Sequence, residues 1–392
     1  MKKSGDQHFI KQINRSLVLD TIIAHAPLSR SDIASFTGLN KATVSSLVNE
    51  WMEEQLVFET GLGTSSGGRK PVMLLFHREA GCSIGVDLGV NYVSALLTDL
   101  NGQVISRELR RLTETEPKNV AEQIVQTVRY LIDQAPNAPY GVIGVGVGVP
   151  GIVNGNGVVL TAPNLGWNGV PLRDMLEAEL GIPVTIDNEA NAGAAGEKQY
   201  GTGKDADSLV YISAGIGIGT GFILHNEVYR GASGLSGELG HMTIQADGGL
   251  SCSCGSTGCW EMYASEKALL RRTGRTQEYE QLEDVLRLAS AGDAEAIAAL
   301  ADIGRYLGIG LASIMNAYNP DLIIIGNRLA LAKPWLEHKI ADSASRCSLR
   351  HHRECARVEF TTLGLDSTAL GAASFAIQAF LHRKKTGDSR FR

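Results

Sequence analysis

We single out no hydrophobic run in the sequence that is long enough to cross a bilayer. The longest apolar stretch that we single out, GVIGVGVGVPGIV from Gly141, is short and rich in glycine, whereas a membrane-spanning helix needs about 20 apolar residues. No positively charged start is followed by an apolar block, so a secretory signal peptide is not indicated. These absences predict a soluble, cytoplasmic protein without contact to a membrane.

Cysteine is too sparse for a disulfide framework. The chain has 6 cysteines in 392 residues, whereas disulfide-stapled folds are short chains with closely spaced pairs. Three of the six crowd into one segment and the other three are scattered. This distribution fits a reducing compartment.

Length and charge predict more than one domain. A chain of 392 residues exceeds the roughly 250 to 300 residues at which a single core stops growing. The net charge is -6, but residues 1–80 carry nine Lys and Arg against eight Asp and Glu, which leaves 27 against 34 for the remainder. A mildly basic segment joined to an acidic body permits nucleic-acid contact at one end only.

The first 78 residues have the pattern of a small helical module. Apolar residues at helical spacing predict a helix in HFIKQINRSLVLDTIIAHA, which Pro27 ends. A short second helix has Ser29 or Ser31 as its cap and Gly38 as its stop. A third helix begins with Asn40 as its cap. The apolar stripe of this third helix consists of Val44, Leu47, Val48 and Trp51.

The other face of the third helix carries short polar groups that suit a DNA major groove. A solvated helix surface would explain that face equally well if it stood alone. The next segment, LVFETGLGTSSGGRKPVMLLF, predicts two strands joined by a loop with two cations, which resembles a wing that contacts phosphates. Together these elements predict a winged helix-turn-helix over residues 1–78. The expected DNA-contacting residues are Asn40, Lys41, Thr43, Ser45, Ser46, Asn49, Arg69 and Lys70.

From Cys82 onward the pattern is that of an α/β body with an internal repeat. CSIGVDLGVNYVSALLTDLNGQVISRELRRL predicts a strand, a glycine turn, a strand, an Asn-Gly hairpin and a strand, and SLVYISAGIGIGTGFILHNEVYRG has the same layout. Helices and apolar strands follow each copy. We therefore expect two lobes with a cleft between them, at residues 82–195 and 196–366, and a last helix near 367–382 that packs back on the first lobe.

One short segment, GHMTIQADGGLSCSCGSTGCWE, contains a set of zinc-binding residue types. Three thiolates and one imidazole close a tetrahedral Zn²⁺ site, and the set here is His241, Cys252, Cys254 and Cys259. The alternative is a group of free buried thiols, but the spacing of the nearby glycines would then serve no purpose in packing. Because four protein ligands leave no position for a metal-bound water, we predict a structural ion.

Carboxylates next to that segment suit a carbohydrate. Each sugar hydroxyl both donates and accepts hydrogen bonds, so a sugar site needs carboxylates, amides or an imidazole that converge in a cleft. Glu238 and His241 lie three residues apart in GELGH, and Glu261 ends the cysteine-rich segment. For the two glutamates, an ordinary surface position is the alternative.

The chain resembles the ROK family (repressors, open reading frames and sugar kinases), which has the actin/hexokinase fold. The resemblance lies in GVDLGVNYVSALLTDLNG, GVPGIV, APNLGW, GTGFILHNEVYRGASGLSGELGH and CSCGSTGCWE, and with the N-terminal module it covers essentially the whole chain. Within the family, these segments are similar to those of xylose-responsive repressors. The resemblance implies that zinc supports a sugar pocket in the interlobe cleft, and that xylose is the ligand. The implied pocket residues are Asn188, Glu189, Glu238, His241 and Glu261. We expect Asn164 to border the same cleft, with a simple turn role as the alternative.

Three departures from the ROK kinases argue against phosphotransfer. Glu189 stands where the resembling kinases have an aspartate base, and misplacing a catalytic group by about 1 Å can cost roughly 100-fold in rate. Val90 and Asn91 replace a Gly-Thr pair in the turn that cradles phosphate. Asn327 and Arg328 replace the glycines that lie under the nucleotide. We therefore predict that the chain is not an enzyme.

The predicted function is a sugar-responsive transcriptional repressor of a carbohydrate operon. A homodimer that reads a palindromic operator follows from the need for two half-sites. A sugar kinase is the alternative, and a sugar-binding adaptor without DNA affinity is a third possibility. The sequence leaves open whether sugar releases or strengthens DNA binding, and whether glucose replaces xylose.

Overall fold

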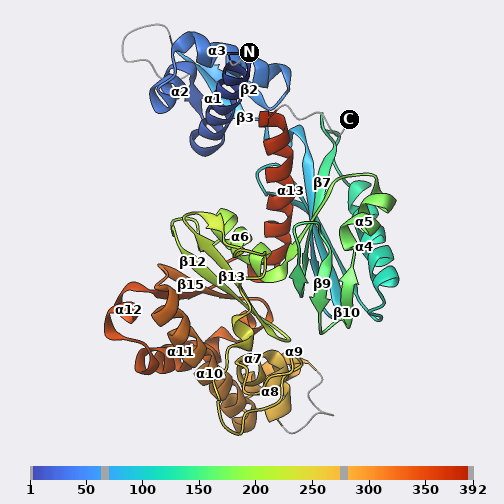
Figure 1. The fold of residues 1–392 in the computed structure, drawn as a ribbon, viewed down its shortest axis with the longest axis vertical. Helices are drawn as coiled ribbons and strands as arrows, with labels where there is room; N and C mark the ends of the chain where they lie inside the picture. Colours follow the sequence, from blue (N-terminus) through green and yellow to red (C-terminus); the bar gives the residue numbers. More distant parts are fainter. Residues whose placement is uncertain (1–2, 63–69, 274–280, 387–392) are drawn as a thin grey trace.

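Three helices and a small antiparallel sheet form the N-terminal part of the molecule, at one end of its long axis (Figure 1). The structure is a computed structural model that describes residues 3–62, 70–273 and 281–386. Strand β3 lies between β1 and β2 in the sheet. We call residues 3–62 and 70–78 the N-terminal module. Its elements are α1 (Lys3–His25), β1 (Leu28–Ser29), α2 (Arg30–Thr37), α3 (Lys41–Glu53), β2 (Val57–Leu62) and β3 (Val72–Phe76).

The helix caps of the module match the sequence signals. Ser29 is the cap of α2: its hydroxyl accepts from the Asp32 amide, and its own amide donates to the Asp32 carboxylate at 2.9 Å. Gly38 ends α2 in the left-handed region, at φ 70°. The Asn40 side chain accepts from the Thr43 amide at 2.8 Å and so begins α3. The predicted stripe of α3 is buried, and strand β1 is an addition that the sequence pattern did not indicate.

A five-stranded sheet in the order β11-β7-β4-β5-β6 forms the first half of the body. Strand β4 pairs antiparallel with β5 and parallel with β7. Helices α4 and α5 cover one face, and a small sheet β10-β9-β8 extends this core. The bounds are β4 (Cys82–Leu88), β5 (Tyr92–Asp99), β6 (Val104–Arg111), α4 (Pro117–Ile132), β7 (Val142–Val149), β8 (Ile152–Val153), β9 (Val159–Ala162), β10 (Trp167–Val170), α5 (Leu172–Leu180) and β11 (Val184–Asn188).

The second half of the body repeats this topology. The order is β14-β13-β12-β15-β16, in which β12 pairs antiparallel with β13 and parallel with β15. The predicted internal repeat is therefore present in the sheets. The bounds are β12 (Leu209–Ala214), β13 (Ile218–Leu224), β14 (Glu227–Val228), α7 (Glu261–Ala264), α8 (Glu266–Arg272), α9 (Leu282–Ser290), α10 (Ala294–Tyr318), β15 (Leu322–Gly326), α11 (Lys333–Cys347), α12 (Arg350–Cys355) and β16 (Arg357–Phe360).

Two helices, α6 (Glu189–Tyr200) and α13 (Ser367–Thr386), lie against each other between the sheets. Glycine is required where their backbones meet the strands. A Cβ atom added to Gly146 of β7 would lie 1.8 Å from the carbonyl oxygen of Ala372 on α13. Between the helices, a Cβ atom on Gly371 would lie 1.7 Å from the carbonyl oxygen of Ala192. These contacts place α13 on the first sheet, as the sequence predicts.

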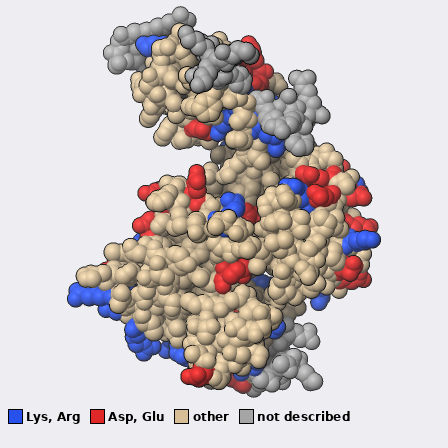
Figure 2. Space-filling model, in the orientation of Figure 1, with Lys and Arg blue, Asp and Glu red and all other residues tan. Residues whose placement is uncertain are grey.

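Helix α13 also carries the N-terminal module. Ala376, Ile377, Phe380 and Leu381 belong to the same hydrophobic cluster as the α1 and α3 side chains. The module stands apart from the body as a separate mass above a narrow neck (Figure 2), and α13 runs through that neck (Figure 1). The helix ends at Thr386, a few residues beyond the predicted 367–382. The last helix thus connects the body to the N-terminal module.

Among the described residues, one helix is long and apolar enough to cross a membrane by length and composition alone. It is α10, which has 25 residues. Its apolar side chains Leu300, Ile303, Leu307 and Leu311 are buried in the core of the second sheet. A core helix has this composition, and α10 packs as one.

Candidate functional site

A cavity of about 110 Å³ lies between the two halves of the body. Its walls come from the β4–β5 turn, the start of α6, the β12–β13 turn and the segment that precedes α7. All of the residues that the sequence suggests for a sugar pocket line this cavity: Asn164, Asn188, Glu189, Glu238, His241 and Glu261. The structure thus brings six residues together that span nearly 100 positions of sequence. Their role as sugar contacts stays a prediction.

Asn188 fixes the geometry of one wall. Its side-chain oxygen accepts from the amides of Ala190 and Asn191, at 2.8 and 3.3 Å, and so caps α6. Its amide nitrogen donates to the carbonyl oxygen of Gly151 at 2.9 Å. This single side chain therefore ties the Pro150–Gly151 turn to the N-terminus of α6, where Glu189 stands.

Glu189 lies in a polar chain at the base of the cavity. Its Oε1 accepts from the Ser213 hydroxyl at 3.1 Å, and that hydroxyl oxygen accepts from Asn327 Nδ2 at 2.9 Å. Burial, followed by the nearby Asp87 carboxylate, raises the pKa of Glu189 to about 8. This pKa lies near neutral pH, so the carboxyl group populates both its protonated and its ionised form there.

Tyr92 is a site residue that the sequence analysis did not single out. Its phenol donates a 2.8 Å hydrogen bond to Asp87, whose carboxyl group is buried. The ring covers the β4–β5 turn so closely that a Cβ atom on Gly89 would lie 2.3 Å from it. Val90 and Tyr92 both line the cavity beside this turn. The sequence signal that could have indicated this role is the aromatic residue at the end of the GVNY turn.

Arg328 closes the cavity from the opposite half of the body. Its guanidinium binds Glu266 through Nε at 2.8 Å and Nη2 at 3.2 Å, and it binds Glu283 at 2.9 Å. Glu266 is buried, so the side chain of Arg328 is held on two sides. The large side chain of Arg328, which follows β15, is therefore fixed in place.

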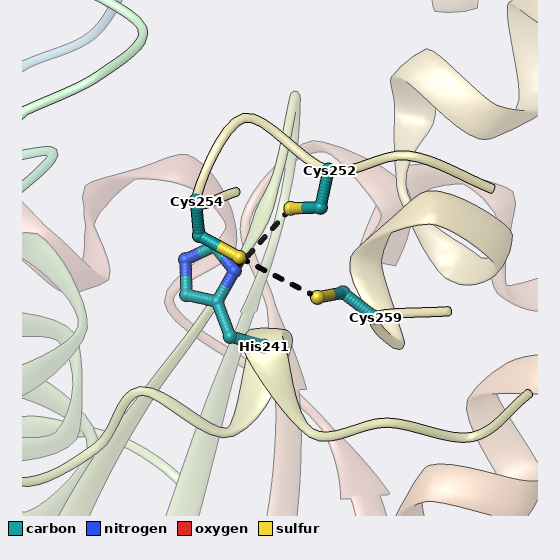
Figure 3. Close-up of side chains that lie close together, drawn as sticks. All are labelled: His241, Cys252, Cys254 and Cys259. Carbon is teal, nitrogen blue, oxygen red and sulfur yellow. Dashed lines mark hydrogen bonds between the residues drawn. The ribbon is translucent and has the colours of Figure 1, made fainter. Parts of the chain in front are cut away.

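The three cysteines and the histidine converge beside this cavity (Figure 3). Their donor atoms all lie within 4.8 Å of one another. Cys254 Sγ is 3.6 Å from Cys259 Sγ, and Cys252 Sγ is 3.5 Å from His241 Nδ1. Sulfurs that share a tetrahedral zinc at about 2.3 Å lie about 3.8 Å apart, so the spacing fits. The cluster could hold a metal ion.

The two ring nitrogens of His241 face different parts of the site. Its Nδ1 faces Cys252, whereas its Nε2 lies 3.9 Å from Glu238 Oε2. Glu261 lies on the boundary, because its Oε1 is 3.2 Å from Cys252 Sγ and 3.8 Å from His241 Nδ1. The imidazole can thus serve a metal with one nitrogen and a cavity ligand with the other.

The residues expected to contact DNA lie on the N-terminal module, far along the chain from this cavity. Most of them are exposed, whereas Thr43 and Ser45 are partly buried and Arg69 lies outside the described residues. Asn40 uses its side-chain oxygen to cap α3. Asn49 accepts from Arg30 at 3.2 Å, and Arg30 also binds Glu59 of β2 at 2.9 Å. Arg30, which the sequence did not single out, thus orders one exposed side chain of α3.

Comparison with known protein families identifies the family to which the chain belongs. The model of the ROK family matches residues 83–379. The chain belongs to the ROK family. The xylose repressor of Bacillus subtilis (strain 168) is 41% identical over 377 residues, which cover 96% of this chain and 98% of the repressor.

Two solved structures show how the ROK chains differ in extent. A ROK family transcriptional regulator, a homologue of the E. coli MLC protein, has a TM-score of 0.81 and 27% identity, and the match covers 96% of this chain and 99% of that one. The Streptomyces griseus ROK glucokinase in complex with glucose and AMPPNP has a TM-score of 0.69 and 31% identity. That match covers 76% of this ROK chain and 100% of the glucokinase. The two-domain body is therefore similar to a sugar kinase, and the rest of the chain is an addition to it.

Proposed function

We propose that this ROK protein is a sugar-responsive, DNA-binding transcriptional repressor of a carbohydrate operon. The observation that carries the proposal is the similarity to a xylose repressor over 96% of the chain, which includes the N-terminal module. The ROK family model begins only at residue 83, after that module. The segment that the glucokinase lacks is thus shared with a repressor.

The cavity supports regulation rather than phosphotransfer. The Tyr92 ring covers the turn where a phosphoryl group would need close approach to the backbone. Arg328 is held by Glu266 and Glu283 on the other side. The chain is therefore a regulator that retains the kinase body, and it is not an enzyme.

The N-terminal module is proposed to be a winged helix-turn-helix. A turn at Gly38 joins helices α2 and α3, and β2 pairs antiparallel with β3, which supports this proposal. Lys41, Ser46 and Asn49 lie exposed on α3, which suits a helix that enters the major groove. Lys70 lies exposed before β3, where a wing contacts phosphates. A palindromic operator and a homodimer complete this proposal.

The ligand of the cavity is proposed to be xylose, and the ion of the cysteine cluster is proposed to be structural zinc. Amide, carboxylate and imidazole groups converge on the cavity, which suits a molecule with several hydroxyl groups. The zinc would hold His241 by Nδ1 and leave Nε2 to the sugar. The domain boundaries at 78, 82–195 and 196–366 remain part of the proposal. The boundary between 195 and 196 falls within α6.

Three measurements on one preparation test the function. Calorimetric titration with xylose and with glucose identifies the sugar, and a mobility shift with upstream DNA, with and without the sugar, identifies the response. An ADP assay with ATP-Mg tests the kinase alternative. Sugar-dependent DNA binding without ADP supports the repressor. ADP formation at about 1 to 100 per second would establish a kinase, and sugar binding without DNA affinity at low salt would establish an adaptor.

A further inference from the structure

A loop of the second half of the body reaches across to the first half. This loop, residues 229–241, follows β14 and carries two cavity residues, Glu238 and His241. It is closed on itself, because the Ser236 hydroxyl donates to the Tyr229 carbonyl oxygen at 2.8 Å and the Ser236 amide donates to the Arg230 carbonyl oxygen at 3.2 Å. We call it the cavity loop.

Arg230 of the cavity loop binds the end of β11. Its Nε and Nη2 donate to one oxygen of Asp187, at 2.9 and 2.6 Å. The other oxygen of Asp187 accepts from Asn191 Nδ2 at 2.9 Å and from the Asn188 amide at 2.8 Å. The Asp187 side chain is 14% exposed and the Arg230 side chain is 45% exposed, so the pair lies at the surface with its carboxylate largely covered. Asp187 therefore joins Arg230 to the residues that begin α6 at the cavity.

The same guanidinium lies over the ring of Phe375 on α13, 5.4 Å from its centroid. Farther along α13, the carbonyl oxygens of Lys384 and Thr386 accept from Arg15 and Gln12 of α1. Arg230 is thus in contact with the helix that carries the N-terminal module.

A groove of about 1120 Å³ is lined by both Arg230 and Phe375. Ala232 and Gly234 of the cavity loop line it too, as do Asp20 and Ile23 of α1. The cavity loop, α13 and α1 therefore border one open space.

We infer that Arg230 is a positioning residue that couples sugar occupancy to the N-terminal module through Asp187 and Phe375. This inference rests on the proposed function and names the connection within it. When a sugar draws the cavity loop inward, the guanidinium changes its position between Asp187 and the Phe375 ring, and α13 shifts its hold on α1. Coupling between two such sites changes affinity by about 5- to 150-fold in typical cases.

The test measures coupling separately from binding. A palindromic DNA fragment is selected from a random pool by the wild-type protein, and its dissociation constant is measured by fluorescence anisotropy with and without saturating D-xylose. The ratio of the two constants is the coupling factor. We expect the coupling factor of Arg230→Gln to be closer to 1 than that of the wild type, by at least fivefold. The xylose dissociation constant from calorimetry should change less than threefold. Arg230→Lys, which keeps the charge at Asp187, should restore part of the ratio.

Arg173→Gln is the matched control, because Arg173 lines the same groove and pairs only weakly with Asp174, at 3.9 Å. Its coupling factor should equal that of the wild type. If Arg230→Gln does not fold, Phe375→Leu tests the connection from α13 and should also lower the ratio. A wild-type ratio in Arg230→Gln, or in Phe375→Leu where that variant replaces it, overturns the inference and leaves the repressor function intact. A wild-type protein that selects no DNA, or that ignores xylose, overturns the proposed function and this inference with it.

Discussion

The phenol of Tyr92 donates a 2.8 Å hydrogen bond to the buried carboxyl group of Asp87, directly beside the cavity between the two halves of the body. Burial raises the pKa of Asp87 to about 7, although the hydrogen bond from Tyr92 partly opposes that rise. The pair thus holds a buried, hydrogen-bonded carboxyl group that is partly protonated at neutral pH.

The first prediction concerns the pH dependence of stability. In the unfolded chain Asp87 loses its proton near its ordinary pKa of 3.8, whereas in the folded chain it keeps the proton until about pH 7. Stability from this group is therefore complete below pH 4 and is lost as the pH rises toward 7. Asp87→Asn should be more stable than the wild type at pH 8, by up to roughly 4 kcal/mol, and the difference should vanish near pH 4.

Urea unfolding at pH 4, 6 and 8 measures this difference. Asp174→Asn, at a carboxylate with 75% of its side chain exposed, is the control and should show no such trend. An Asp87→Asn variant that is less stable than the wild type at pH 8 would contradict the protonated assignment.

The second prediction concerns the kinase motif. Glu189→Asp restores the residue type of the kinases, but it leaves Tyr92 over the turn and Arg328 bound to Glu266. We therefore expect no ADP from this variant with ATP-Mg and xylose or glucose, in a coupled assay sensitive to 0.01 turnovers per second. Turnover in Glu189→Asp alone would show that the aspartate, and not the covered turn, decides activity. Glu189→Gln serves as the control for background hydrolysis.

The third prediction concerns the cysteine cluster. Cys254→Ser removes one donor of the four, whereas Cys347→Ser changes an exposed cysteine outside the cluster. Bound zinc, measured by a colorimetric chelator after unfolding, should fall in the first variant and stay constant in the second. Because His241 would lose its anchor, xylose binding in Cys254→Ser should weaken by about 1 to 3 kcal/mol. Normal xylose binding by a zinc-free sample would refute the link between metal and pocket.

The fourth prediction concerns DNA contact. Lys41→Ala and Lys70→Ala each remove an exposed cation from the N-terminal module. If both contact phosphates, each substitution should reduce the slope of log affinity against log salt by about 1. Lys118→Ala on α4 of the body is the control, and it should leave the slope unchanged. Ser46→Glu should also weaken binding, since it places a negative charge on the face of α3 that we propose to contact DNA.

The fifth prediction concerns the packing of α13. Gly146→Ala would force a methyl group within 1.8 Å of the Ala372 carbonyl oxygen, so it should destabilise the body by about 3 kcal/mol. Gly155→Ala has no atom within 4 Å of the new methyl group and should stay within about 0.5 kcal/mol of the wild type. The transition midpoint in urea compares the two. Equal midpoints would exclude the close contact between β7 and α13.

The helices and strands could be predicted because their signals are local. The alternation in the repeated segments gave both sheets, and the caps at Ser29 and Asn40 gave the starts of α2 and α3. The pocket residues were found through the resemblance to ROK proteins, and the structure gathers them around one cavity. Periodicity and caps depend on neighbours within a few positions, which a single sequence contains.

The missed features depend on contacts between distant segments. The ring of Tyr92 covers a glycine three positions earlier, but its partner and its burial depend on how β4 and β5 pack in the body. Arg328 meets Glu266 and Glu283, which lie 62 and 45 positions away. Arg230 meets Asp187 over 43 positions. No local pattern marks which charged side chains pair across such separations.

Helix α13 is the last described helix of the chain, and it supports the module formed by the first residues. During synthesis, α1 to α3 leave the ribosome before the segment on which they rest has been translated. The contacts between α1 and α13 therefore cannot form in a nascent chain until α13 has been synthesised.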